Sequence, residues 1–484
     1  MLLGKLLERT GAKIAREHGR ILISGITFDA ESVRPGDLFV CLRGSRADGH
    51  DFCERAGQLG AAAVLAEQEE DCGIPCAIVA DTRKALSLVS QNFYGRPAEK
   101  LKIITVVGTN GKTTTAYLIH ELLERCGMRS AFIGTMYIEY GGIRYPSSLT
   151  TPDPTDLNRL FAELVEKRIE YVVMELSAHA IYYDKLYGIR AEVAVFTNFS
   201  RDHLDFFKDM DVYKKVKKSW FTFSNCKCAV INADDPCGAE LLSEGKVPSI
   251  SYGLDSPSDV FAVNIERAPS GTDFVINLMD ELIYAETRLF GRFNVYNTLA
   301  ACSAARLLGA EPKSMEKYLP LIAPPDGRFS LVCEGGVNYV IDFAHTPDGL
   351  ENLLKAAREI TRGKLICVFG CGGDRDATKR PMMGEIASRL ADRVVVTSDN
   401  PRTESRAAIA EDICAGIGED ADLIVILDRE TAIRHAVDRA ASGDTVVIAG
   451  KGSEGYIDEN NVKTPYSDKS ALENALAARR RIAE

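Results

Sequence analysis

Residues 108–115 are GTNGKTTT and directly follow the apolar run IITVV, so a glycine-rich turn joins a predicted buried strand to a helix. The backbone N–H groups of such a turn, together with the N-terminus of the next helix, form a site for phosphate. Lys112 would reach the β- and γ-phosphate oxygens of a nucleotide, and the Thr113 hydroxyl would join the ligand shell of a Mg²⁺ ion. Val106 stands where the usual P-loop has its first glycine, so the motif alone is only moderately specific. It predicts a bound phosphate and leaves open what is done with it.

Two further stretches place metal-binding side chains at the ends of predicted strands. In VVMELSAH, Glu175 closes a buried strand at 171–176, where a carboxylate is costly unless it is paired or binds a metal. In TNFSRDHLDFF, His203 follows the next predicted strand, at 191–199. Glu175 and His203 could serve a second Mg²⁺, although imidazole is an unusual ligand for this ion. For each residue alone, a structural role (a capped strand end, a lone structural histidine) remains the alternative.

A third polar group belongs to the C-terminal third of the chain, in GCGGDRD, SDNPR and GKGSEG. The first of these is not a dinucleotide fingerprint, because Arg375 occupies the position of the third glycine. Arg402 has a planar fork that suits a carboxylate, and Glu454 suits an ammonium group. Two arginines and a carboxylate predict a site for a zwitterion, whereas unrelated surface turns are the alternative for any one of them.

Short apolar runs that alternate with helical patterns must position these groups, and they predict an α/β fold of three domains. The boundaries are expected near residues 99 and 328, which gives domains at 1–98, 99–327 and 328–484. The central part is expected to contain a parallel sheet with an antiparallel appendage at about 258–293. Five strands are expected in the third part, with their Gly- and Asp-rich ends meeting at one edge of the sheet, where ligands of open α/β sheets bind.

Composition excludes several classes of protein. The chain has 484 residues, 46% of them hydrophobic, and a net charge of −11 without any basic run, which disfavours a nucleic-acid binder. No apolar stretch is long enough to span a membrane. The thirteen cysteines are scattered without metal-binding or redox spacing, so we expect reduced thiols in a cytoplasmic protein.

Taken together, these motifs resemble the Mur ligase family, which uses ATP to join amino acids to the growing peptidoglycan precursor. The resemblance extends from about residue 24 to 468 and rests on motifs that occur in the family's order: GTNGKTTT, MELSAH, TNFSRDHLD, GRFNVYN, DFAHTPDGLENLL, FGCGGDRDATKRP, DNPR and GKGSE. The pairing of GCGGDRD with DNPR resembles the branch that adds a diamino acid to UDP-N-acetylmuramoyl-L-alanyl-D-glutamate. The resemblance implies a UDP-sugar-binding first domain, a P-loop ATPase second domain and a Rossmann-like third domain that binds the amino acid.

The resemblance also implies roles for individual residues. ATP would contact the central loop and parts of both later domains, namely Gly108, Thr109, Asn110, Gly111, Lys112, Thr113, Thr114, Asn294, Asn297, Arg328, Asp342 and His345. The sugar-peptide would lie along Thr150, Thr151, Ser177 and Lys185. The amino acid would lie among Arg375, Asp399, Asn400, Arg402, Gly450 and Glu454. Lys112, Glu175, His203 and Lys217 would be catalytic, with two Mg²⁺ ions held by Thr113, Glu175, His203 and Lys217.

Lys217 needs a chemical change for that role. The family carries a carbamylated lysine in a Y-x-x-x-K pattern, and counting from Tyr213 places it at Lys217. The carbamate is an anion and supplies the oxygen ligands that magnesium prefers. The other lysines of this helix, Lys214, Lys215 and Lys218, are expected to form a solvated face.

The form DNPR is typical of family members that add meso-diaminopimelate, because Arg402 can pair with that substrate's second carboxylate. Addition of L-lysine or another diamine is the alternative within the family. A P-loop ATPase switch or a non-catalytic binding module is the alternative from another class. The first domain departs from the family pattern at Ala30 and Glu31, near the expected sugar site. We expect a monomer that binds small molecules.

Overall fold

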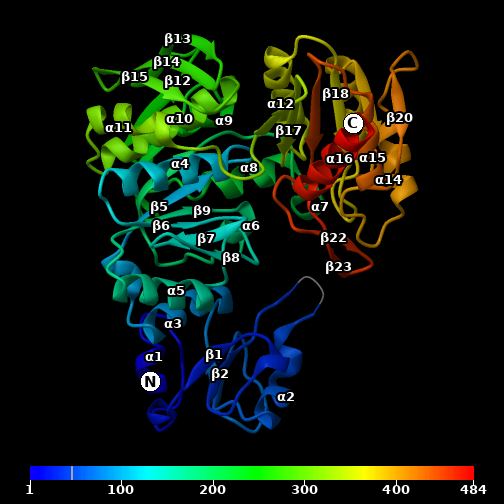
Figure 1. Ribbon diagram of the computed structural model, residues 1–484. Helices are drawn as coiled ribbons and strands as arrows, with labels where there is room; N and C mark the ends of the chain where they lie inside the picture. Colours follow the sequence, from blue (N-terminus) through cyan, green and yellow to red (C-terminus); the bar gives the residue numbers. More distant parts are fainter. Residues whose placement is uncertain (45–46, 484) are drawn as a thin grey trace.

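The computed structural model describes residues 1–44 and 47–483 and contains three α/β parts along the chain (Figure 1). In Figure 1 the N-terminal part lies at the bottom, the central part above it and the C-terminal part at the upper right. No helix in the described ranges is long and apolar enough to cross a membrane. All thirteen cysteines lie in these ranges as free thiols, as their scattered spacing predicts.

The N-terminal part has a four-stranded parallel sheet in the order β1-β2-β3-β4. Strands β2 and β3 are fully buried because apolar clusters cover both faces of the sheet. The strands are β1 (Gly25–Thr27), β2 (Asp37–Val40), β3 (Ala63–Ala66) and β4 (Cys76–Ile78). The helices are α1 (Leu3–Leu6), α2 (Cys53–Gln58) and α3 (Thr82–Phe93).

The central part has an eleven-stranded sheet in the order β15-β14-β13-β12-β11-β10-β5-β9-β6-β7-β8. Its middle strands are β5 (Lys102–Val107), β6 (Ser130–Ile133), β9 (Tyr171–Glu175), β10 (Ala191–Phe196), β11 (Cys226–Asn232) and β12 (Ser249–Gly253). These strands are parallel, as predicted, and helices cover both faces. Its helices are α4 (Lys112–Arg125), α5 (Pro154–Glu166), α6 (Ala178–Tyr182), α7 (Leu204–Phe207), α8 (Met210–Lys218), α9 (Pro236–Glu244), α10 (Arg292–Leu307) and α11 (Pro312–Tyr318).

Further strands extend this sheet at both edges. The expected antiparallel appendage is present as β13 (Val260–Ala268), β14 (Gly271–Leu278) and β15 (Glu281–Thr287), but β13 pairs in parallel with β12, so the appendage continues the central sheet rather than standing apart. The opposite edge, β7 (Tyr137–Tyr140) and β8 (Ile143–Pro146), was not predicted.

The C-terminal part has a six-stranded sheet in the order β16-β17-β21-β18-β19-β20. The five predicted strands are parallel: β17 (Val337–Asp342), β18 (Leu365–Phe369), β19 (Arg393–Val396), β20 (Leu423–Val425) and β21 (Thr445–Ala449). The antiparallel edge strand β16 (Ser330–Glu334) and the hairpin of β22 (Tyr456–Glu459) and β23 (Val462–Pro465) were not predicted. Helices α12 (Pro347–Ile360), α13 (Lys379–Leu390), α14 (Arg406–Cys414), α15 (Arg429–Arg439) and α16 (Asp468–Ala483) complete this part.

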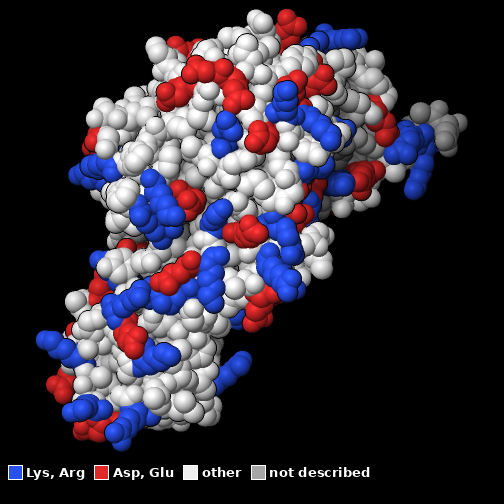
Figure 2. Space-filling view, turned by 90° about the vertical axis from the view of Figure 1, so that its left-hand side faces the viewer, with Lys and Arg blue, Asp and Glu red and all other residues white. Residues whose placement is uncertain are grey.

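Acidic and basic side chains are mixed over the face of the molecule in Figure 2, and neither sign forms one continuous patch there. This distribution agrees with the absence of a basic run in the sequence. The Lys-rich helix α8 is only partly the solvated face that we expected, because Lys214 and Lys218 both pair with Glu240 on α9. Lys217, in contrast to these lysines, is buried in the protein interior.

Candidate active site

The glycine-rich loop 108–111 lies between β5 and α4 and is fixed by the end of the neighbouring strand β10. Asn198 accepts a hydrogen bond from the Asn110 N–H (2.8 Å) and donates to the Asn110 carbonyl (3.0 Å). Gly111 has a φ of 82°, which favours glycine, and a β-carbon at Gly108 would collide with the Thr197 side chain. The loop conformation therefore depends on both glycines and leaves α4 with its N-terminus at the loop.

Glu175 and Thr113 are in direct contact, as two ligands of one cation would be. Thr113 Oγ1 donates to Glu175 Oε2 (3.0 Å), and Thr135 donates to the same carboxylate from its N–H (2.8 Å) and its hydroxyl (3.2 Å). Glu175 is only 1% exposed, and no salt bridge to it is found in the described parts of the chain. A buried carboxylate held only by neutral donors beside a P-loop threonine has the chemistry of a Mg²⁺ site.

Two lysines at the loop have amino groups that are shielded from water. Lys112 Nζ donates to the carbonyls of Gly108 (3.1 Å) and Thr109 (2.8 Å), and burial lowers the pKa of Lys112. Lys217 is 1% exposed; its Nζ donates to Thr109 Oγ1 (2.8 Å) and lies 4.3 Å from the centre of the Tyr213 ring. Burial, and next the charge of Lys112, hold the pKa of Lys217 well below its usual value. Burial of this amine therefore disfavours its charged form.

His203 directly precedes α7 with a φ of 56° and lies beside Asp202 (Nε2–Oδ2 3.3 Å). Burial lowers the pKa of His203 to about 3, so its imidazole is neutral and has a lone pair to offer a metal. No hydrogen bond joins His203 to Glu175 in the described residues. Asp202 is also approached from the C-terminal part, by His345 (3.7 Å) and Lys379 (3.9 Å).

The C-terminal part reaches the phosphate loop with several side chains. Arg328 Nη2 donates to Thr113 Oγ1 (2.9 Å), and its guanidinium lies 4.4 Å from the centre of the Phe343 ring. Asp348 at the start of α12 accepts a hydrogen bond from Asn110 Nδ2 (2.7 Å). Asp342 accepts hydrogen bonds from the N–H groups of Phe329 and Ala344, and burial raises the pKa of Asp342. Of the expected nucleotide residues, Arg328 therefore reaches Thr113 beside the loop, His345 approaches Asp202, and Asp342 fixes the segments that carry these two residues. Asp348 contacts the loop and was not predicted.

The two asparagines of GRFNVYN lie under the loop on α10. Asn297 accepts from Thr115 Oγ1 (3.1 Å) and donates to Asn294 (2.9 Å), and both are buried. Asn297 Oδ1 lies where a β-carbon of Gly111 would be. Thr114 is buried in the first turn of α4.

The residues expected along the sugar-peptide lie next to Glu175. Thr151 Oγ1 donates to the Glu175 carbonyl (2.9 Å) and accepts the Ser177 N–H (3.1 Å). Lys185 reaches the same loop, because its Nζ donates to the Thr151 carbonyl (3.1 Å) and pairs with Asp153 (2.8 Å). The Thr150 and Thr135 hydroxyl oxygens lie 3.1 Å apart, within hydrogen-bond distance, so this loop is linked through Thr135 to the carboxylate of Glu175.

The three predicted strand ends of the C-terminal sheet do meet at one edge. Asn400 Nδ2 donates to Glu454 Oε2 (2.8 Å), and Gly450, with a φ of 115°, lies against Asp399 Oδ2. Between them lies Lys451, which is fully buried and bonds to Asn400 Oδ1 (2.9 Å) and to Glu454. Glu454 therefore already has a cation partner from its own chain.

The two arginines of this region differ in their surroundings. Arg402 has a φ of 49°, donates from Nη1 to the Gly373 carbonyl, and lies 4.0 Å from Asp458 (Nε–Oδ2). Arg375 is about half exposed and reaches across to Asp205 of the central part (3.6 Å). Arg402 belongs to the group of side chains at these strand ends, whereas Arg375 lies at the border of this group with the central part.

Sequence reasoning missed residues whose partners are distant along the chain. Lys451, Asp348 and Lys379 lie inside motifs that the sequence analysis used, but nothing in the sequence marks these three residues individually. Arg429 and Asp468 form an ion pair with both side chains 0% exposed, and Arg429 also donates to the carbonyls of Ser398 (3.1 Å) and Ala449 (2.9 Å). Because these carbonyls directly precede Asp399 and Gly450, the hydrogen bonds from Arg429 fix the two strand ends that carry Asp399 and Gly450. For the Arg429–Asp468 pair, the sequence offers only one indication, which is a charged residue at a helix position expected to be apolar.

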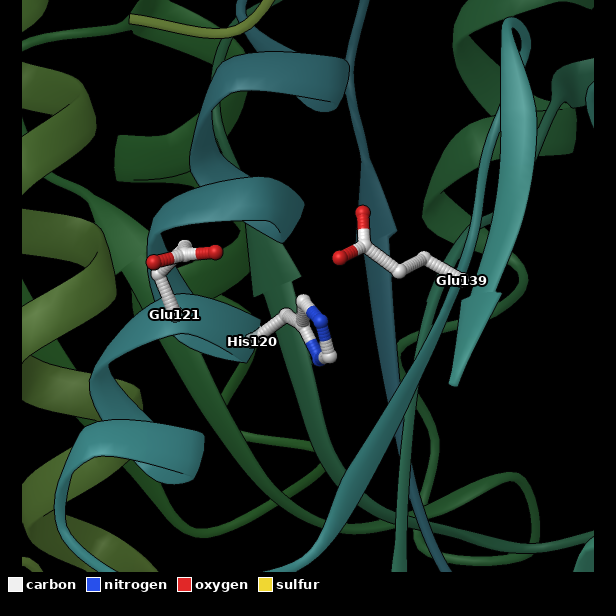
Figure 3. Close-up of side chains that lie close together, drawn as sticks. All are labelled: His120, Glu121 and Glu139. Carbon is white, nitrogen blue, oxygen red and sulfur yellow. The ribbon is translucent and has the colours of Figure 1, made fainter. Parts of the chain in front are cut away.

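A cluster away from this region has cation-binding side-chain types. His120 on α4 lies beside the carboxylates of Glu121 and Glu139 (Figure 3). Glu121 is paired with Arg125 (2.9 Å) and Glu139 with Arg144 (2.8 Å), so the two carboxylates are neutralised by two arginines. A divalent ion would leave this cluster with an excess of positive charge, and we assign no metal to it.

Comparison with known proteins agrees with the arrangement of the three parts. Family models match residues 22–102 (Mur ligase family, catalytic domain), 106–305 (Mur ligase middle domain) and 327–452 (Mur ligase, glutamate ligase domain). The chain is 43% identical over 442 residues to the UDP-N-acetylmuramoyl-L-alanyl-D-glutamate–2,6-diaminopimelate ligase of Syntrophomonas wolfei, covering 90% of each chain. It is 39% identical to the protein of the same name from Geobacillus thermodenitrificans, covering 99% of this chain and 100% of the relative.

A solved structure of a UDP-N-acetylmuramoyl-L-alanyl-D-glutamate–2,6-diaminopimelate ligase superposes with a TM-score of 0.71 at 30% identity and covers 99% of both chains. The predicted three-domain fold is thereby confirmed. The matched models span most of the sequence, and the identity to the relatives extends over nearly its full length. The chain belongs to the Mur ligase family.

Proposed function

We propose that the chain is an ATP-dependent ligase that adds meso-diaminopimelate to UDP-N-acetylmuramoyl-L-alanyl-D-glutamate, in the synthesis of peptidoglycan precursor. The observation that carries the proposal is the pairing of two sites: a phosphate loop with Glu175, and a group of strand-end side chains with Arg402, in a chain whose relatives are named for this reaction. The three domains at 1–98, 99–327 and 328–484 would bind the UDP-sugar, ATP and the amino acid respectively.

In the first step, the γ-phosphoryl group of ATP passes to the C-terminal carboxylate of the UDP-linked dipeptide and gives an acyl phosphate and ADP. Lys112 now donates to the carbonyls of its own loop and would exchange them for phosphate oxygens. Arg328 lies against Thr113 and would add a second positive charge there. The incoming amine then attacks the acyl carbon, and a tetrahedral intermediate collapses to the amide and phosphate.

Thr113, Glu175, His203 and Lys217 would hold two Mg²⁺ ions, which neutralise charge on the phosphoryl oxygens when bound. Glu175 fits this role as a buried carboxylate without a cation partner in the described residues. Lys217 fits as a carbamate, because the unprotonated amine is the form that reacts with CO₂, and burial favours this form of Lys217. The reaction forms an N–C bond, releases a proton and converts the amine into an anion.

The amino acid would bind among the strand-end side chains at the edge of the C-terminal sheet. Arg402 would pair with the second carboxylate of diaminopimelate, and Asn400, Asp399, Gly450 and Glu454 would surround the remaining groups. Lysine lacks that carboxylate and would leave the guanidinium without its partner, which disfavours the lysine-adding alternative.

The test of ligase against ATPase switch is phosphate release by the purified protein. The proposal predicts release only when ATP, the UDP-linked dipeptide and the diamino acid are all present. Release that is independent of the dipeptide and the diamino acid would identify an ATPase switch, and no release under any condition would identify a binding module.

A further inference from the structure

The last helix of the first part, α3, lies against the central part, where it packs on α5 (Figure 1). Polar side chains of α3 are buried at this contact: Ser87 and Ser90 are 0% exposed, and Gln91 is 2% exposed. Buried hydroxyl and amide groups are costly unless they form hydrogen bonds. The partners of these side chains therefore show what the helix holds.

Ser87 and Gln91 hold the loop 183–189 of the central part by its backbone. Ser87 Oγ lies 3.2 Å from the Lys185 carbonyl oxygen and 3.0 Å from that of Tyr187, so its single proton is shared between the two. Gln91 Nε2 donates to the Tyr187 carbonyl (2.8 Å). Neither carbonyl accepts a backbone N–H in the described residues, so both depend on α3 for a hydrogen-bond donor.

The loop approaches α3 closely because of a glycine. Gly188 has a φ of 78°, and a β-carbon at this position would lie 2.8 Å from the Leu88 side chain. The charged side chains at this contact do not bond to either carbonyl in the described residues; they are Arg83, Lys84 and Asp184. The two neutral side chains of α3 therefore fix the loop.

The loop carries Lys185, whose side chain extends to the segment 150–153 beside Glu175. Lys185 Nζ donates to the Thr151 carbonyl (3.1 Å) and pairs with Asp153 (2.8 Å). Thr151 Oγ1 in turn donates to the Glu175 carbonyl (2.9 Å). A continuous series of contacts thus runs from a helix of the first part to the strand end that carries Glu175.

We propose that Ser87 and Gln91 are positioning residues, which act through Lys185 to align the peptide end of the UDP-linked substrate with the phosphate loop. This inference rests on the proposed function and deepens it, because it names the helix that sets the position of the segment 150–153. The UDP end would be bound by the first part itself. The helix α3 then joins the sites for the two ends of one substrate.

The test uses Ser87→Ala in the full-length protein, with Ser90→Ala as a matched control. Both serines are fully buried on α3, but Ser90 Oγ has no hydrogen-bond partner in the described residues, so its removal breaks no contact. The KM values for the UDP-linked dipeptide and for ATP are measured, together with amide hydrogen exchange of residues 183–189.

We expect Ser87→Ala to raise the KM for the UDP-linked dipeptide at least about fivefold, the lower limit for a buried acceptor left without a donor. Hydrogen exchange in the loop should become faster by a similar factor. The KM for ATP should change less than about twofold, and Ser90→Ala should change none of the three. Gln91→Met removes the other donor and serves as a second variant, with the same expected contrast.

A lower kcat with both KM values unchanged would show only a loss of folded protein and would overturn the inference. Equal rises in the two KM values, or a rise that Ser90→Ala shares, would overturn it as well. Absence of any product from the UDP-linked dipeptide in the unaltered protein would instead overturn the proposed function. In that case the contrast in hydrogen exchange between Ser87→Ala and Ser90→Ala would still test whether α3 holds the loop, so the two failures are distinguishable.

Discussion

Replacing Arg429 by Met removes the buried cation beneath the proposed amino-acid site. Arg429 makes two 2.7 Å hydrogen bonds to Asp468 at the start of α16, and both side chains are 0% exposed. It also donates to the carbonyls of Ser398 and Ala449, at the ends of β19 and β21. The substitution leaves a buried aspartate without a cation and two carbonyls without a donor.

The expected cost follows from that geometry. Breaking a buried pair by removing one partner costs about 3–5 kcal/mol, because the remaining charge stays desolvated. We therefore expect α16 to undock more easily by about 4 kcal/mol, which corresponds to a loss of hydrogen-exchange protection of about a thousandfold in residues 468–483. The only tryptophan, Trp220, lies in the central part, so its fluorescence would not report this change.

Hydrogen exchange of the full-length protein is the assay, with Arg434→Met as the control, because Arg434 is exposed on the same helix α15. The control should change protection by less than a factor of about two. The double variant Arg429→Met with Asp468→Leu should recover at least half of the loss, because no charge then remains buried. Equal protection in Arg429→Met and the control, or a double variant worse than the single one, would refute the reasoning.

Three further outcomes are expected. Lys217→Ala should abolish turnover with partial rescue by a small carboxylate, measured as phosphate release, and near-normal activity would remove the carbamate from the account. Arg402→Ala should raise the KM for diaminopimelate at least tenfold and leave the KM for ATP unchanged, whereas equal changes would contradict its role. Burial, with the Arg144 charge, lowers the pKa of His120 to about 4, so the unfolded chain binds a proton that the folded protein does not between about pH 6.5 and 4. Folding stability should therefore fall as pH drops through this window, by about 2 kcal/mol at pH 5. In urea titrations at pH 7 and 5, His120→Asn should lose less stability than the unaltered protein by this amount. An identical loss of stability in both proteins would contradict the prediction.

Much of the fold was predictable because buried parallel strands are continuous apolar runs. The strands β7, β8, β12, β16 and the β22–β23 hairpin were missed, because they have at least partly exposed residues and lack such runs. The buried strand β6 was also missed, because its apolar run has only four residues. The β13–β15 strands were predicted, but their attachment to β12 depends on a pairing that alternation cannot give. The exact limits of the three domains stay predictions.

The parts of the site that lie in contiguous motifs were predictable, because a phosphate loop or a strand-end glutamate is defined by its immediate neighbours. Lys451 and Arg429 were not, because each acts through partners on other strands. The pairing of Glu454 with Lys451 also changes its interpretation, since the sequence suggested a free partner for a substrate ammonium. The roles of the individual site residues remain predictions that the proposed variants test.

The central claim is tested most directly by the mass of the product. The purified protein is incubated with ATP, UDP-N-acetylmuramoyl-L-alanyl-D-glutamate and either meso-diaminopimelate or L-lysine, and the UDP-linked product is identified by mass spectrometry. The account predicts a UDP-linked tripeptide that contains diaminopimelate, formed together with stoichiometric ADP and phosphate, and little or no lysine product. A product that contains lysine in preference to diaminopimelate, or ADP formed without any new UDP-linked product, would contradict it.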